Sequence, residues 1–238
     1  VDFNTLKSVE ILKGPGSTLY GSDALGGILS YRSIEAKDLL DAGESFSVEI
    51  PVNYTGYNSG KSGAIKIAGQ DESIGISAVG VFSVLDSSET KPKDFTNRDE
   101  WINTIDKEGK TFYINAEKEF DENQKIGIIV EKVNRDTDLS RGAEAIAYEN
   151  SRTYVYSQKD RDLEVEKDKV VLSYKYKNGE LDKIIDSFTA KAYIQNSKID
   201  DTWDDKLVLR GTPQHRVSDY KLKDEAYGVD LQFGKDIN

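Results

Sequence analysis

Hydrophobic and polar residues alternate with a period of two over most of the chain from residue 44 onward. This alternation predicts β-strands with one apolar and one polar face, because successive side chains of a strand point to opposite sides. Pro51 lies within the first of these segments and is expected to weaken its hydrogen-bond ladder, because proline has no backbone N–H. Eight strands are predicted, over residues 46–55, 64–69, 74–84, 111–120, 126–130, 170–176, 188–194 and 227–233.

The connections between the predicted strands alternate in length after the first hairpin. Outer-membrane barrels sort their connections in this way, with tight turns at one end and extended loops at the other. The pattern therefore favours part of a membrane barrel over a soluble β-sandwich, although Greek-key sandwiches also gather loops at two poles. Short turns are predicted at residues 70–73, 121–124 and 178–179, and long polar loops at 86–109, 135–162 and 197–219.

The predicted apolar faces carry many aromatic residues near the strand ends. Rings at that height form the interfacial girdles of membrane barrels. Aromatic residues also favour strands of any kind, so this feature supports the barrel without deciding for it. The residues concerned are Tyr54, Tyr57, Phe82, Phe112, Phe120, Tyr176, Phe188, Tyr227 and Phe233.

Residues 9–31 follow a different pattern, a short strand, a glycine-rich loop and a second short strand. Gly14-Pro15-Gly16 ends the first apolar run, and Gly26-Gly27 opens the second. Five glycines within residues 14–27 suit a backbone that adopts positive φ or passes close to another surface. A glycine-rich turn of an α+β domain is the simpler alternative. A phosphate-binding loop is rejected because the G-x-x-x-x-G-K-S/T spacing is absent.

Composition narrows the class of protein. The net charge of −11 argues against nucleic-acid binding, which needs a basic surface. The absence of cysteine excludes a disulfide framework and thiolate metal sites, and it agrees with an oxidising cell envelope. Mean hydropathy is −0.59, and no apolar run approaches the roughly 18 residues that a membrane helix needs. Because the chain has no methionine, we expect that an export signal has been removed or lies upstream.

No catalytic arrangement of residues stands out in the sequence. The single histidine and the lack of cysteine leave little scope for histidine-based triads, cysteine dyads or histidine-rich zinc sites. Carboxylates are numerous, so a sugar hydrolase with two carboxylates about 5–9.5 Å apart is the enzyme alternative. We expect that the protein is not an enzyme.

Residues 9–31 closely resemble the end of the plug domain of TonB-dependent receptors, outer-membrane barrels whose lumen is closed by a plug. Two departures are conservative: Lys13 stands where arginine is commoner, and Ser30 stands where asparagine is usual. The resemblance implies the C-terminal part of an α+β plug domain at residues 1–40, followed at 41–238 by the N-terminal strands of an all-β membrane barrel. The motif positions are Lys13, Gly14, Pro15, Leu19, Tyr20, Gly21, Ala24, Gly26 and Gly27.

The resemblance also implies a partial barrel and a set of partners. Barrels of this family have about 22 strands, so about eight antiparallel strands are expected to form an open curved sheet with two unpaired edges. The implied location is the bacterial outer membrane, in contact with its lipid. The implied energy source is the TonB complex, reached through a motif that precedes residue 1. No nucleic-acid partner is expected.

Residues 31–46 lie between the plug motif and the first strand. They are similar to the same connection in receptors for haem, haemoglobin, transferrin and lactoferrin. This similarity implies uptake of haem or iron from a host haem or iron protein, with haem as a transported ligand and no intrinsic cofactor. Receptors for siderophores and other small ligands share the plug motif and are one alternative. An ungated structural or adhesin barrel is another.

Several residues in the predicted long loops are candidates for ligand contact. His215 is the candidate axial ligand of haem iron, although a lone loop histidine is more often simply solvated. Trp101 and Trp203 are candidates for contact with a host protein, or else pack their own loops. The acidic residues of 200–205, with Asp219, lack the spacing of an EF-hand calcium loop and are expected to be solvated. The sign-balanced run 159–169 is expected to extend the barrel wall past the lipid headgroups.

Overall fold

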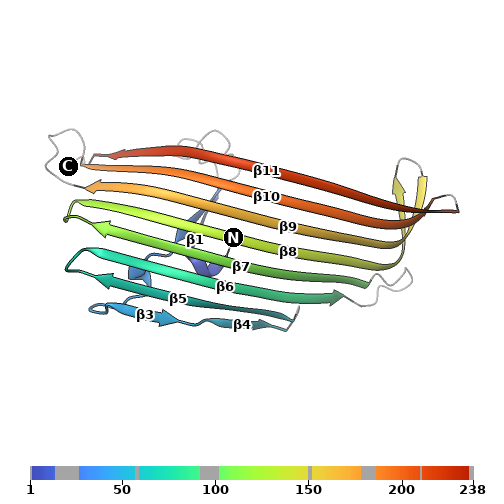
Figure 1. The fold of residues 1–238 in the computed structure, drawn as a ribbon, viewed down its shortest axis with the longest axis horizontal. Coiled ribbons are helices and arrows are strands. Elements are labelled where there is room, and N and C mark those ends of the chain that lie inside the picture. The colour runs from blue at the N-terminus through green and yellow to red at the C-terminus, as the bar shows by residue number, and fades with distance from the viewer. Residues whose placement is uncertain are drawn as a thin grey trace.

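Antiparallel β-strands make up most of the structure (Figure 1). The computed structural model describes residues 2–13, 27–56, 59–91, 102–149, 152–177, 186–209 and 211–235. These residues form one large sheet and one small hairpin. Within them, no helix has the length and apolar character needed to cross a membrane.

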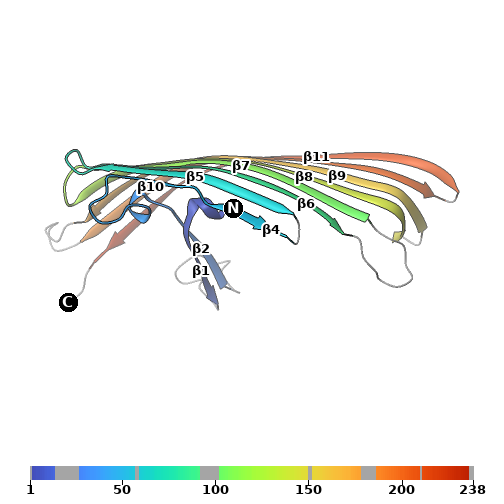
Figure 2. The ribbon, with the colours of Figure 1, turned by 90° about the horizontal axis from the view of Figure 1, so that it is seen from below.

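The large sheet is a meander in which each strand pairs with its neighbours in sequence. Its order is β11-β10-β9-β8-β7-β6-β5-β3, and β4 also pairs with β5. The sheet is strongly curved, with β11 at one edge and β3 and β4 at the other (Figures 1 and 2). Its strands are β3 (Phe46–Glu49), β4 (Val52–Thr55), β5 (Gly60–Asp71), β6 (Ile76–Lys91), β7 (Ile102–Glu119), β8 (Gln124–Glu149), β9 (Arg152–Lys177), β10 (Ser187–Leu209) and β11 (Thr212–Gly234).

Strands β3 and β4 are two halves of one edge strand. They pair with β5 in a single register, with Phe46 opposite Gly69 and Val52 opposite Gly63. Between them the Ala64 N–H still donates to the Pro51 carbonyl at 3.0 Å, but Pro51 has no N–H to return the bond. The interruption expected at Pro51 is therefore present, and counting β3 and β4 as one confirms the eight predicted strands.

The predicted long loops are wrong wherever the structure describes them. Strands β8 and β9 are each 26 residues long and run through most of 135–162, while β10 and β11 run through most of 197–219. The sequence of these stretches is polar, but polarity does not break a strand. Backbone groups that face a neighbouring strand are satisfied by the antiparallel ladder, and charged side chains pair across strands. The run 159–169 accordingly lies within β9, and Trp203 and His215 lie on β10 and β11 rather than in loops.

The register places the predicted apolar residues of every strand on one face of the sheet, which we call the outer face. One row of paired neighbours runs Ile114, Val130, Val170, Ile194 and Tyr227 across β7 to β11. Residues that lie an odd number of positions along a strand from this row point to the other side of the sheet, the inner face. The predicted alternation is thus confirmed strand by strand.

Aromatic rings gather on the outer face at the end of the sheet where β5 connects to β6 and β7 connects to β8. The centroids of Phe188 and Phe233 lie 5.0 Å apart, and those of Tyr174 and Phe188 lie 6.4 Å apart. Phe120 and Phe233 are about three-fifths exposed, at 59% and 63%. This row has the position of an interfacial girdle on one side of a lipid-facing band.

The N-terminal segment, which we define as residues 2–13 and 27–40, lies on the concave, inner face of the sheet (Figure 2). It contains the 3₁₀ turns η1 (Phe3–Thr5) and η2 (Ala36–Asp38) and the antiparallel hairpin of β1 (Leu6–Lys13) and β2 (Gly27–Ser33). Small wall residues allow this close approach. The buried cluster consists of Ile34, Ala36, Ala64, Ala68, Val79, Val81 and Tyr113.

A charge on the outer face is expected to disrupt assembly if that face contacts lipid. Leu172 is 55% exposed and lies in the middle of the apolar rows, so Leu172→Arg is expected to cost about 2–4 kcal/mol in a membrane. The matched control is Val171→Arg, whose side chain points to the inner face. Assembly would be measured on gels, by comparing how far the protein from the membrane fraction migrates with and without heating. Equal loss in both variants would contradict the assignment of faces.

Candidate functional site

The contact between the N-terminal segment and the inner face is the candidate functional site, because it joins the plug-like motif to the sheet. The β1–β2 hairpin brings Lys13 opposite Gly27. Gly27 has φ of +144°, and a Cβ there would lie 2.7 Å from the Leu12 carbonyl oxygen, so only glycine fits. Of the motif positions, Lys13 and Gly27 are described. Gly14, Pro15, Leu19, Tyr20, Gly21, Ala24 and Gly26 lie outside the described residues.

Ile34, which follows β2, is pinned to the sheet through its backbone. Its N–H donates to the Thr5 carbonyl at 3.0 Å. Its carbonyl accepts from the Tyr113 hydroxyl at 3.0 Å and from Asn115 Nδ2 at 3.1 Å, both on β7. Tyr113 and Asn115 are buried, so water cannot readily replace these bonds. The backbone at Ile34 is therefore a fixed point on the wall.

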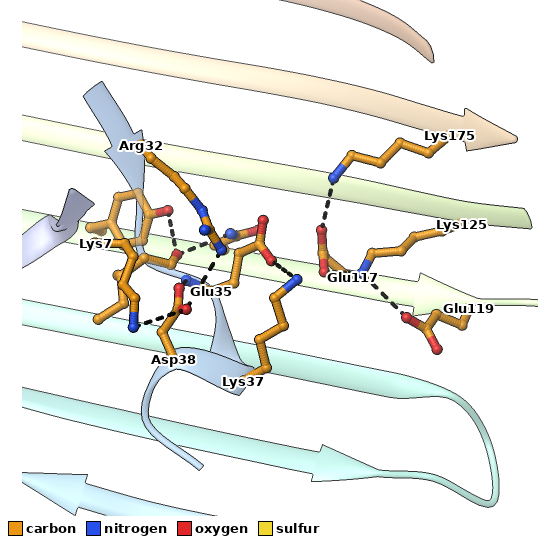
Figure 3. Close-up of polar contacts among 12 residues, drawn as sticks. Lys7, Arg32, Glu35, Lys37, Asp38, Glu117, Glu119, Lys125 and Lys175 are labelled. Atoms are coloured by element: carbon orange, nitrogen blue, oxygen red, sulfur yellow. Dashed lines mark hydrogen bonds and ion pairs between the residues drawn. The ribbon is translucent and has the colours of Figure 1, made fainter. Parts of the chain in front are cut away.

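Asp38, in the turn η2, connects that turn to β1 and β2 of the N-terminal segment (Figure 3). Its carboxylate lies 3.3 Å from Lys7 Nζ on β1 and 3.6 Å from Arg32 Nη2 on β2. It also accepts a hydrogen bond of 2.9 Å from the Glu35 N–H, within the turn η2. The Asp38 side chain is only 7% exposed, whereas its two cationic partners are about half exposed. The carboxylate holds the hairpin in one orientation above the sheet.

Asp2 makes a second attachment to the wall. Its carboxylate accepts from the Asn4 N–H at 2.8 Å and from the Ser83 hydroxyl on β6. Burial alone would raise the pKa of Asp2, but the hydrogen bonds from Ser83, the Asn4 N–H and Thr111 outweigh it and lower the pKa below its ordinary value of 3.8. The attachment is therefore made by the ionised carboxylate.

A group of ion pairs lies where the segment meets the turn end of the sheet (Figure 3). Lys125 Nζ is 2.5 Å from Glu117 and 3.2 Å from Glu119, and Lys175 Nζ is 3.8 Å from Glu117. Across a small cavity of about 120 Å³, Lys37 Nζ lies 2.5 Å from Glu35.

Burial acts to raise the pKa of Glu35, but the hydrogen bond and charge of Lys37 and the charges of Lys175 and Lys125 lower it overall. The Lys37–Glu35 pair belongs to the segment and the other pairs belong to the wall, and the charges of Lys175 and Lys125 act on Glu35 across the cavity.

The start of the chain matches a known family model. Residues 1–28 match the model of the TonB-dependent Receptor Plug Domain. The chain is 40% identical over 76 residues to the hemin receptor of Yersinia enterocolitica, a match that covers 32% of this chain and 11% of that protein.

Two other relatives are named for the iron proteins that they bind. Identity is 29% over 91 residues with transferrin-binding protein A of Haemophilus influenzae, covering 38% and 10% of the two chains. Identity is 38% over 58 residues with lactoferrin-binding protein A of Neisseria meningitidis, covering 24% and 6%. Over the matched residues the chain is similar to TonB-dependent receptors. The matches span about a tenth or less of the length of these relatives.

A solved receptor has the same fold over nearly the whole chain. BauA, the ferric preacinetobactin receptor from Acinetobacter baumannii, aligns with a TM-score of 0.59 and 15% identity. The alignment covers 98% of this chain and 45% of that one. The partial barrel preceded by the end of a plug, expected from the sequence, is thus confirmed as the fold of this receptor. The domain boundary between residues 40 and 41 stays a prediction.

His215 lies on the outer face of the receptor, away from the N-terminal segment. Its Nε2 is 2.7 Å from Asp204 Oδ1, and its side chain is 57% exposed. It is on the same face of β11 as Tyr227, because an even number of residues separates them without a register shift. A haem held inside the barrel is on the opposite side of the wall, so the low expectation for His215 as a haem ligand stays a prediction.

Trp203 lies on the inner face of the receptor, between charged neighbours. Arg161 Cζ and Lys159 Nζ on β9 are 4.7 Å and 4.9 Å from the centre of its ring. Trp101 is outside the described residues. Sequence reasoning did not single out Arg161, Tyr113 or Asn115. The sequence feature that could have identified them is their position: each is a bulky residue at a position predicted to be polar, on the face of the strand that points into the lumen.

Removing the charge of Asp38 is expected to loosen the N-terminal segment. Asp38→Asn keeps an acceptor for the Glu35 N–H but loses the pairing with Lys7 and Arg32. Because both cations are about half exposed, the expected cost is about 1 kcal/mol, or about fivefold faster amide exchange in β1 and β2. Hydrogen–deuterium exchange would measure it, with the exposed Glu10→Gln as control. Unchanged exchange in Asp38→Asn would show that the ion pairs do not hold the hairpin.

Acid is also expected to release the segment. The pKa values of Asp2 and Glu35 are lowered in the folded state, so their stabilisation is complete above the ordinary values of 3.8 and 4.5. It is lost as the pH falls through the lower folded-state values. Protease sensitivity of the segment between pH 6 and pH 3 would measure this. In the double variant Asp2→Asn, Glu35→Gln the pH dependence should flatten; an unchanged profile would exclude these two groups as its source.

Proposed function

We propose that this receptor takes up haem, or iron from a host haem or iron protein, across the bacterial outer membrane with energy from the TonB complex. The main support is the attachment of the plug-like N-terminal segment to the inner face through the Ile34 carbonyl and the Asp2 carboxylate. A segment held by a few hydrogen bonds and a small apolar contact inside a curved wall can close a pore and still be displaced. The outer face, with its exposed apolar rows, is proposed to contact outer-membrane lipid.

The names of the relatives support the choice of ligand. A hemin receptor, a transferrin-binding protein and a lactoferrin-binding protein each match between about a quarter and two fifths of the chain. The proposed ligands are therefore haem as cargo and a host iron or haem protein as its source, bound by parts of the receptor outside the membrane. The proposed role is transport rather than catalysis, with no intrinsic cofactor.

Uptake of a ferric siderophore is the second candidate function. It is favoured by the likeness of fold to BauA, which is a ferric preacinetobactin receptor. Identity with that chain is only 15%, so the likeness speaks for the fold and leaves the ligand open. An ungated structural or adhesin barrel is the third candidate, and it differs from both by needing no TonB.

Growth on a single iron source separates the three candidates. Cells that depend on this receptor and are starved of other iron are expected to grow on haemin only when TonB is present. His215→Ala is expected to grow as well as the parent, because the side chain points away from the lumen. Growth on a ferric siderophore but not on haemin would favour the second candidate, and growth that ignores TonB would refute active uptake. Loss of haemin growth in His215→Ala would reverse the placement of the iron ligand.

A further inference from the structure

The inner face continues without interruption from the plug attachment to Trp203. Tyr113, which holds Ile34, pairs with Glu131, and this row continues through Lys169 to Gln195 on β10. Trp203 is eight residues beyond Gln195 on the same strand. The register shifts between β8 and β9 and between β9 and β10 lie beyond Trp203 in the same direction, so they do not change its face. Because eight is an even step, the Trp203 side chain is on the face that receives the N-terminal segment.

In the part of the sheet beyond the apolar rows, the inner and outer faces differ in the sign of their charged residues. The ranges compared are 104–110, 131–140, 159–169, 195–206 and 215–226. On the inner face the charged residues are Lys107, Arg135, Lys159, Arg161, Lys167, Lys169 and Arg216, against Glu131, Asp201, Asp205 and Asp224.

On the outer face of the same ranges the balance is reversed. The carboxylates are Asp106, Glu108, Asp136, Asp138, Asp160, Asp162, Glu164, Glu166, Asp168, Asp200, Asp204, Asp219 and Glu225, against Lys110, Lys132, Lys198, Lys206, Lys221 and Lys223. Within these ranges the inner face therefore carries an excess of positive charge, and the outer face carries an excess of negative charge.

Trp203 is the centre of a compact group on this basic face. The cations of Arg161 and Lys159 both lie within 5 Å of its ring centre, at 4.7 and 4.9 Å. Arg161 is held in place by two bonds to Asp201, of 2.8 Å from Nε and 3.0 Å from Nη2. Tyr220 on β11 is paired with Asp201 and is 60% exposed, so a second ring borders the group.

We propose that Trp203, Arg161 and Lys159 form a contact site for a planar ligand that carries carboxylate groups, as a porphyrin does. The partly exposed indole offers an apolar contact, and the ammonium and guanidinium groups that lie over its ring offer donors for carboxylates. The fixed orientation of Arg161 lowers the entropy lost when a ligand binds. This inference rests on the proposed function and names the part of the wall that cargo meets on its way to the plug.

Haemin and its dimethyl ester separate the two halves of this chemistry, because the ester keeps the porphyrin ring and loses the negative charges. With the receptor in the outer membrane, the double variant Lys159→Gln, Arg161→Gln is expected to bind haemin about tenfold more weakly, as for the loss of one good charge-assisted bond. Its affinity for the dimethyl ester is expected to be unchanged. Trp203→Ala is expected to weaken binding of both.

Lys132→Gln, Lys198→Gln is the matched control, because it removes two positive charges from the outer face of β8 and β10. It is expected to bind haemin like the parent. Arg161→Lys keeps the positive charge and serves as the test variant if the double variant misfolds. Gel migration checks that all variants assemble. An assembled Arg161→Lys, with Lys159 intact, is expected to bind haemin more strongly than the double variant.

The outcomes separate this inference from the proposed function. If the parent receptor binds neither haemin nor its ester, the proposed function fails and this site fails with it. If the parent binds haemin and the inner-face double variant binds it equally well, the site is refuted while the function stands. The site would also be refuted if the inner-face double variant bound haemin and the ester with equally weakened affinity, or if the outer-face control lost the same affinity for haemin. In either case, recognition of charge by Lys159 and Arg161 would play no part in binding.

Discussion

The antiparallel hydrogen-bond ladder that joins β5 to β11 decides on which face of the sheet each side chain lies. Because the side-chain period is two, a slip of one residue in any pair would turn the apolar residues of that strand toward the inner face. Tyr113 and Trp203 share a face only because the register between β7 and β10 is kept over three successive strand pairs. The plug attachment and the charge sorting both follow from this register.

The attachment of the N-terminal segment combines a small apolar contact with well-paired polar groups. Alanine and valine side chains let the backbone at Ile34 come close enough for Tyr113 and Asn115 to donate to its carbonyl. Asp38 then fixes the hairpin through charges that are partly open to water on the cationic side. Such contacts are specific in geometry, and they are cheaper to separate than a large apolar interface, because their groups can be solvated again.

Sequence reasoning located the strands and their faces well, and it failed at the strand ends. Alternation reports directly which face of a strand is apolar, and Pro51 marks the break in the edge strand for a covalent reason. The stretches 135–149 and 197–209 lose the regular alternation of apolar and polar residues and carry many charges, so they resembled loops. They form strands because a neighbouring strand supplies backbone partners and opposite charges, as Asp201 does for Arg161. A polar stretch carries no local sign that such a partner exists.

By itself, the sequence determined the alternating faces of the wall, the glycine at position 27 and the resemblance to TonB-dependent receptors. Only the tertiary structure decided that the Ile34 carbonyl meets Tyr113 and Asn115, that Asp38 joins Lys7 to Arg32, and that Trp203 lies beside Arg161. The residues on β7 are 79 and 81 positions from Ile34. A periodic pattern states which way a side chain points within its own strand, but the choice of partner depends on register and curvature, which arise only when the strands pair.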